Sequence, residues 1–147
     1  MATSVQTSDQ AATSGVRRAA RTGYRWLLLV FLLAVAAQIF LAGLGVFSFD
    51  AGDQAGGSHA FSAHQGLGWA LAGVSILILA LALAARPGRL ALWLAVALVV
   101  QTCLLQSLLD GLADDTAVFG GLHALDGLLI AASAGVQYAL ARRRAGR

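Results

Sequence analysis

Two histidines, His64 and His123, lie inside long apolar segments and share a repeated local context. Each is followed four residues later by a glycine, Gly68 or Gly127, and eight residues later by an alanine. Imidazole is the commonest metal ligand in proteins and an axial ligand of haem iron. An ionisable residue inside an apolar segment is also a functional candidate in its own right. The pattern therefore predicts a metal or haem centre with His64 and His123 as its ligands.

Haem b is the cofactor that this pattern favours, because two histidines on parallel helices supply the two axial ligands of a six-coordinate haem. Glycines one turn from the histidines would leave room for the flat macrocycle, so Gly68 and Gly127 are predicted to contact the cofactor. One feature argues against haem: its propionates would point to the end of the segments where the sequence has no arginine or lysine.

Other interpretations of the same residues stay open. Small residues at four-residue spacing also let membrane helices pack closely, and a histidine can serve only as an interhelical hydrogen-bonding group. Copper or zinc is a further candidate, although zinc normally takes more ligands than two histidines. The sequence offers no nucleophile triad and no glycine-rich phosphate loop, so it leaves open whether the protein is an enzyme.

Further polar residues accompany the histidines. Asp126 follows His123 by three residues, on a neighbouring part of the same helical face. It could orient an imidazole, relay protons, or bond to a neighbouring helix in its protonated form. His59 lies in a glycine-rich segment and could add to the ligand set or be solvated. The remaining intramembrane polar residues are most simply interhelical hydrogen-bonding groups: Gln38, Gln101 and Gln106.

Composition identifies the elements that must position these residues. The chain is 59% hydrophobic and 12% charged, with a mean hydropathy of +0.76, which excludes a soluble enzyme, a disordered chain and a disulfide scaffold. Its one cysteine, Cys103, cannot form an intramolecular disulfide. Four apolar segments are each about long enough to cross a hydrocarbon core of roughly 30 Å. They are residues 25–47, 61–85, 90–109 and 118–141, with approximate bounds.

An internal repeat relates the two halves of the chain. Gln38 in the first segment and Gln106 in the third each precede a glycine by five residues, and the histidines occupy equivalent places in the second and fourth segments. We therefore predict an all-α integral membrane fold, an up-down bundle of four transmembrane helices built from two parallel-repeat helical hairpins. The two histidines would lie at similar depth on diagonal helices. An axis separation of roughly 11–14 Å would be too wide for direct imidazole contact but suited to a ligand between the rings.

Charge placement predicts the orientation. All ten basic residues are arginines, and they flank the apolar segments on one side, whereas the other side carries Asp50, Asp53, Asp114 and Asp115. By the positive-inside rule both termini are cytoplasmic in a multi-pass protein of a bacterial plasma membrane. The predicted organisation is a disordered cytoplasmic tail (1–22), a transmembrane domain (23–142) and a basic tail (143–147). The arginines are interpreted as topology anchors that touch anionic lipid, and no nucleic-acid partner is expected.

Several motifs together resemble an uncharacterised bacterial family of four-span proteins, over about residues 24–142. They are Gln38 to Phe47, His64 to Gly68, Arg86-Pro87-Gly88-Arg89, Leu105-Gln106-Ser107 and Gly121 to Gly127. The architecture is also similar to one half of haem A synthase and to cytochrome b561-type bundles, which place histidines on the second and fourth helices. This likeness implies haem binding or electron transfer. Haem A synthase has Glu-x-x-His-Arg at its first histidine, whereas Phe61 and Gln65 stand here, so its oxygenation chemistry is not implied.

Two functions follow as expectations. The first is a small integral membrane protein that binds b-type haem through His64 and His123, for electron transfer or haem handling, with a membrane redox partner or a homo-oligomer around it. The alternative is a non-catalytic structural or accessory membrane subunit without a cofactor, in which the histidines only pack.

Overall fold

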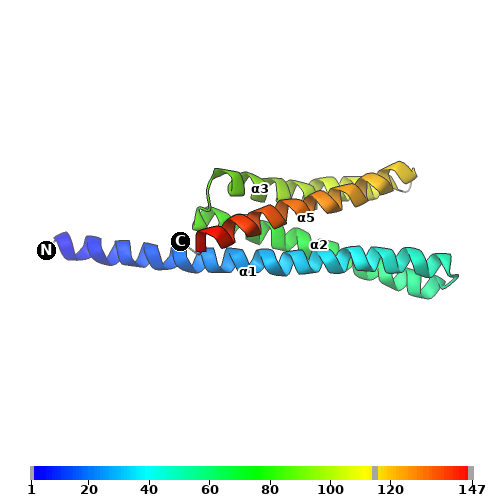
Figure 1. The fold of residues 1–147 in the computed structure, drawn as a ribbon, viewed down its shortest axis with the longest axis horizontal. Helices are drawn as coiled ribbons and strands as arrows, with labels where there is room; N and C mark the ends of the chain where they lie inside the picture. Colours follow the sequence, from blue (N-terminus) through cyan, green and yellow to red (C-terminus); the bar gives the residue numbers. More distant parts are fainter. Residues whose placement is uncertain (1, 114–115, 146–147) are drawn as a thin grey trace.

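The computed structural model describes residues 2–113 and 116–145, and every element within them is helical. The elements are α1 (Ala2–Asp50), α2 (Gln54–Ala85), α3 (Arg89–Val100), the π-helical segment η1 (Gln101–Leu105), α4 (Gln106–Ala113) and α5 (Ala117–Ala145). The segments α3, η1 and α4 follow one another without a break, and together they form the third long helix of the bundle (Figure 1).

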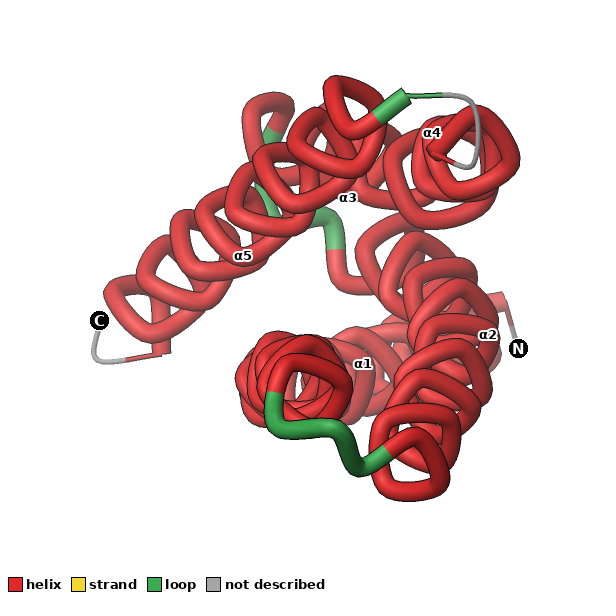
Figure 2. The backbone as a smooth tube through the Cα atoms, turned by 90° about the vertical axis from the view of Figure 1, so that its right-hand side faces the viewer, coloured by secondary structure: helices red, strands yellow, loops and turns green. Residues whose placement is uncertain are grey.

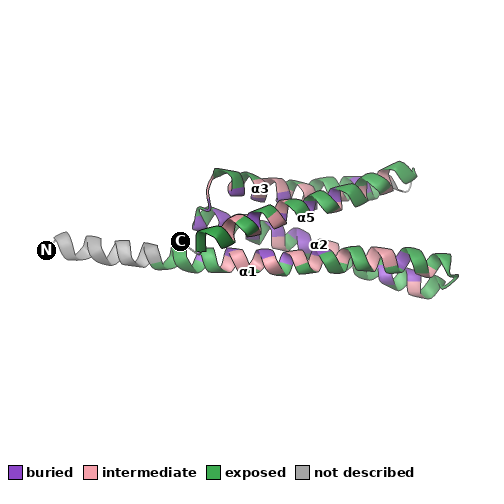
Figure 3. Cartoon of the chain, in the orientation of Figure 1, coloured by how far each residue is buried: buried purple, intermediate pink, exposed green. Residues whose placement is uncertain are grey.

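Four helices are long and apolar enough to cross a membrane, as the hydropathy pattern predicts. The candidate spans are Gly15–Asp50, Gln54–Ala85, Arg89–Leu112 and Ala117–Ala145. Only 17–28% of their apolar windows is buried inside the chain. Most of the large apolar side chains, such as Trp69 and Phe47, therefore lie on the outside of the bundle, where a soluble protein would place polar ones (Figure 3).

The helices pack around a ring in which α2 and α5 occupy opposite corners (Figure 2). Helix α1 packs against both α2 and α5, and the third helix contacts the same two from the other side. The largest fully buried apolar side chains are Tyr24, Phe31, Leu28, Ile78 and Leu98. They form the apolar core in the half of the bundle that carries the arginines, so His64 and His123 lie beyond the region that apolar side chains fill.

The turns between helices are shorter than the sequence indicates. Residues 48–60 look like a glycine-rich loop, yet α1 continues to Asp50 and α2 begins at Gln54. Asp53 caps α2, because its carboxylate accepts a hydrogen bond from the backbone N–H of Gly56 at 2.9 Å. Gly57 packs directly on the ring of Phe49, where a side chain would collide. The glycines of this stretch therefore allow the close approach of α1 and α2 at their ends.

The N-terminal segment also differs from the expectation. Composition predicts disorder over residues 1–22, whereas α1 is helical from Ala2 onward; Met1, like Asp114 and Asp115, lies outside the described residues. Extending an existing helix adds one hydrogen bond per residue without a new nucleation step. Alanine, the commonest residue of this segment, also favours helix. At the other end, α5 includes Arg143 and Arg144 in its last turn.

Candidate histidine site

The two predicted ligands face each other between opposite corners of the bundle. His64 on α2 and His123 on α5 have ring centroids 6.1 Å apart, with an angle of 49° between the ring planes. Both side chains are half-buried. The axis separation expected for diagonal helices, roughly 11–14 Å, does not set the distance between the two rings, because each imidazole extends from its helix axis toward the other.

The hydrogen bond of His64 determines which ring nitrogen is available. Its Nδ1 lies 3.0 Å from the backbone carbonyl oxygen of Gln38 on α1. A carbonyl oxygen can only accept, so Nδ1 carries the proton and donates it. The other nitrogen, Nε2, then has its lone pair free. A histidine that ligates a metal is typically held in this way, with its second nitrogen bonded to a carbonyl or carboxylate.

Gln38 also bonds to the backbone of the same histidine. Its amide Nε2 donates to the carbonyl oxygen of His64 at 2.8 Å. In a helix this oxygen points toward the residue four positions later, which is Gly68. A Cβ atom at Gly68 would lie only 3.1 Å from the Gln38 amide nitrogen. The glycine thus leaves the histidine carbonyl open to a side chain from the neighbouring helix.

The second histidine has a corresponding contact. The amide Nε2 of Gln106 on α4 donates to the carbonyl oxygen of His123 at 3.2 Å. The glycine four residues on, Gly127, again faces this amide, at 3.9 Å from its hypothetical Cβ to the nitrogen. The repeated Gln and His-x-x-x-Gly motifs therefore describe a repeated hydrogen bond. The space beside both glycines, predicted to receive a macrocycle, holds glutamine amides.

Among the described residues, those near His123 include a buried carboxylate that has no counterpart beside His64. Asp126 on α5 is only 3% exposed, and its Oδ1 accepts from Gln101 Nε2 at 3.1 Å. Gln101 opens the π-helical segment, and such segments often occur at functional sites. Within the described part of the chain, four buried side-chain atoms have no hydrogen-bond partner. They are Gln38 Oε1, Gln101 Oε1, His123 Nδ1 and Asp126 Oδ2.

Two phenylalanine rings pack in a row beside His64. The ring of Phe61 meets His64 edge-on at 6.5 Å between centroids and stacks on Phe49 at 5.8 Å. His59, the third histidine of the chain, is exposed on α2, one helical turn and a residue before His64.

The geometry of the pair suits coordination of one metal atom. An imidazole nitrogen coordinates a metal at about 2.0–2.1 Å and lies about 1.1 Å from its ring centre, so two imidazoles on opposite sides of one atom have centroids roughly 6.3 Å apart. The observed separation of the two ring centres, 6.1 Å, is close to this value. Among the residues that the structure describes, no group of three or more histidine, cysteine or acidic side chains could hold a metal.

Sequence reasoning identified the histidines but not what holds them. Gln38 and Gln106 were expected to bond between helices, and they do. Their shared acceptor, the histidine carbonyl, was not foreseen, although the repeated glycine four residues after each histidine was the available signal.

No protein-family model, curated protein sequence or solved structure matches the chain.

Proposed function

We propose that the protein is a small integral membrane protein that binds b-type haem between His64 and His123, for electron transfer or haem handling. The observation that carries the proposal is the separation of 6.1 Å between two imidazoles from different helices. The proton on His64 Nδ1, assigned by its carbonyl partner, leaves Nε2 as the coordinating atom. When bound, haem would supply one-electron redox chemistry at its iron.

The chain's own residues have separate roles in this proposal. Gln38 positions His64 through two hydrogen bonds. Its backbone carbonyl accepts from the imidazole, and its side-chain amide donates to the backbone carbonyl of His64. Gln106 anchors the backbone of His123 but leaves His123 Nδ1 without a partner. The proposed binding therefore rests on the histidines, and Gly68 and Gly127 contribute by admitting the glutamine amides that hold them.

The proposed architecture is an up-down bundle of two hairpins related as parallel repeats. The corresponding Gln38–His64 and Gln106–His123 hydrogen bonds support this relation. The positive-inside rule supports a bacterial plasma membrane with both termini in the cytoplasm. The proposed partners are the lipid bilayer and either a membrane redox protein or further copies of the chain, which the apolar outer surface of the bundle would accommodate.

An absorption spectrum tests the proposal. The protein is purified in mild detergent from haem-supplemented cells and measured before and after dithionite. We expect a Soret band and sharp reduced α and β bands, which His64→Ala or His123→Ala abolishes. His59→Ala is the matched control, because it removes an exposed histidine of α2 and leaves the pair intact. A colourless wild-type protein at full haem supply, with all variants normally folded, would refute haem binding.

The second candidate function is a structural or accessory membrane subunit without a cofactor. It is favoured by the glutamine amides beside Gly68 and Gly127, since these contacts explain the glycines by packing alone. The same experiment separates the two candidates: a subunit of this kind would be colourless, and His64→Ala would change only its stability.

A further inference from the structure

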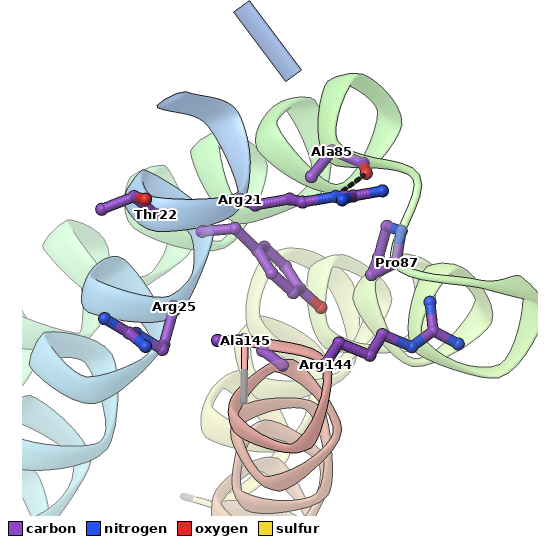
Figure 4. Close-up of a pocket in the computed structure, with 9 residues that line it drawn as sticks. Arg21, Thr22, Arg25, Ala85, Pro87, Arg144 and Ala145 are labelled. Atoms are coloured by element: carbon purple, nitrogen blue, oxygen red, sulfur yellow. Dashed lines mark hydrogen bonds between the residues drawn. The ribbon is translucent and has the colours of Figure 1, made fainter. Parts of the chain in front are cut away.

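A small cavity lies at the opposite end of the bundle from the histidines. It has a volume of about 100 Å³ and is bordered by α1, by the turn between α2 and α3, and by the last turns of α5 (Figure 4). Three of its lining side chains are arginines, Arg21 and Arg25 from α1 and Arg144 from α5. None of its lining side chains is acidic. The guanidinium of Arg25 lies 5.5 Å from the ring centre of the exposed Trp26 and points away from the cavity (Figure 4). Segments distant in sequence thus bring the side chains of Arg21 and Arg144 to one space.

Two of the arginines lie against the backbone around the turn between α2 and α3. Arg21 Nε donates to the carbonyl oxygen of Ala85 at 3.3 Å, which leaves its two terminal nitrogens for other acceptors. The guanidinium of Arg144 packs against Gly88, where a Cβ atom would lie 2.5 Å from its Nη2. Gly88 has a φ of 107°, a conformation that favours glycine. The last residue of α2 therefore accepts a hydrogen bond from Arg21, and Gly88 in the turn leaves space for the guanidinium of Arg144.

Among the side chains that the structure describes, no acidic one lies near this cluster. The described acidic residues beyond residue 15 are Asp50, Asp53, Asp110 and Asp126. The first three lie in or near the connections at the far end of the bundle, and Asp126 lies 18 residues before Arg144 on α5, about 27 Å along the helix. An anion from outside the chain is the natural partner for the cluster. Arginine pairs and phosphate oxygens match in geometry as well as in charge.

The size and position of the cavity limit which anions it can bind. Its volume, about 100 Å³, falls below the roughly 300–1,000 Å³ of pockets that enclose whole drug-sized ligands. It offers space for a phosphate group, and Thr22 is among its lining residues. Basic pockets between the ends of membrane helices bind the headgroups of anionic lipids.

We propose that this cavity binds a phosphate group, carried by an anionic phospholipid or present as free phosphate, with Arg21 and Arg144 as its principal donors. The site lies at the other end of the bundle from the histidines and is independent of haem binding. It joins α1, the α2–α3 turn and α5, so an occupant would link the ends of three helices.

The test measures binding of fluorescent phosphatidylglycerol to the lipid-depleted protein in detergent. The test variant is Arg21→Gln with Arg144→Gln, and the matched control is Arg18→Gln with Arg143→Gln, which removes the same charge from the same two helices outside the cavity. We expect the test variant to bind about tenfold or more weakly than wild type, and the control less than threefold more weakly. Arg144→Gln alone, which keeps the Arg21–Ala85 bond, should weaken binding in the same direction.

Competition distinguishes the two sources of phosphate. If unlabelled phosphatidylglycerol displaces the probe and millimolar inorganic phosphate does not, the ligand is a lipid; if both displace it, the site recognises phosphate as such. Either result supports the proposal when the test variant is the one that loses binding. Equal weakening of the test and control variants, at equal helix content by circular dichroism, would show dependence on net charge alone and overturn it.

Discussion

Replacing each of the two repeated glycines with alanine tests the glutamine contacts directly. Gly68→Ala places a Cβ atom 3.1 Å from the Gln38 amide nitrogen, whereas the corresponding distance at Gly127 is 3.9 Å. The first is closer than ordinary van der Waals contact, so the amide must move by a few tenths of an ångström. The second leaves the Gln106 amide where it is.

The expected energies follow from two opposing terms. Alanine gains about 0.5–1 kcal/mol over glycine inside a helix. Loss of the hydrogen bond to the His64 carbonyl costs about 0.5–1.5 kcal/mol. Gly127→Ala should therefore stabilise the protein by up to about 1 kcal/mol, whereas Gly68→Ala should be close to neutral or destabilising. Gly66→Ala is the reference on the same helix, since no atom lies within 4 Å of its added Cβ.

The assay is equilibrium unfolding in mixed detergent micelles, with the free energy of unfolding compared among the three variants. We expect the free energies of unfolding of Gly66→Ala and Gly127→Ala to exceed that of Gly68→Ala by about 1 kcal/mol. If Gly68→Ala is as stabilising as Gly66→Ala, then the Gln38–His64 hydrogen bond contributes nothing. The interpretation of the repeated motif as a hydrogen-bonded anchor would then be refuted.

Two further predictions concern buried polar pairs. Asp126→Asn should retain most of the stability, because its side-chain oxygen still accepts from Gln101, whereas Asp126→Leu leaves the Gln101 amide unpaired and should cost about 1–3 kcal/mol in the same unfolding assay; equal losses would contradict the contact. Tyr24→Phe removes the buried 2.8 Å hydrogen bond to Gln137 and should destabilise by about 1 kcal/mol. An unchanged unfolding midpoint for Tyr24→Phe would show that this bond adds no stability.

Hydropathy was sufficient to predict the four helical spans, because apolar runs of this length have few alternatives to crossing a bilayer. Helix ends were predicted less well. The glycine-rich stretch before residue 60 has the composition of a loop, but the cap at Asp53 and the packing of Gly57 on Phe49 make most of it part of α2. Both contacts depend on α1 lying alongside, which composition does not encode.

The equal depth of the histidines was predicted from residue counts, but their separation and hydrogen bonds were not. The π-helical segment at Gln101–Leu105 had no signal in the sequence. It coincides with two tertiary contacts, Gln101 with Asp126 and Thr102 with Ser75. The π-helical turn thus occurs where the helix contacts two other helices. Such a feature depends on the assembled bundle and not on the local sequence.

Pairs of polar side chains join the two hairpins. In a membrane, apolar side chains gain little by leaving lipid for one another, so polar pairs contribute to specifying how helices associate. Among the described residues, three pairs of this kind connect the α1–α2 hairpin with the other half of the chain: Tyr24 with Gln137, Ser75 with Thr102, and His64 with His123.

The first two pairs are hydrogen-bonded directly, through hydroxyl groups that need nothing further. The histidine pair is different, because its rings stand 6.1 Å apart and His123 Nδ1, like the neighbouring Gln38 Oε1, is buried without a partner in the described structure. Buried polar groups normally have partners. Direct hydrogen bonds thus account for the first two pairs but not for the third. The proposed haem iron would lie between the two imidazole rings, and the spectrum of the His64→Ala protein tests that proposal.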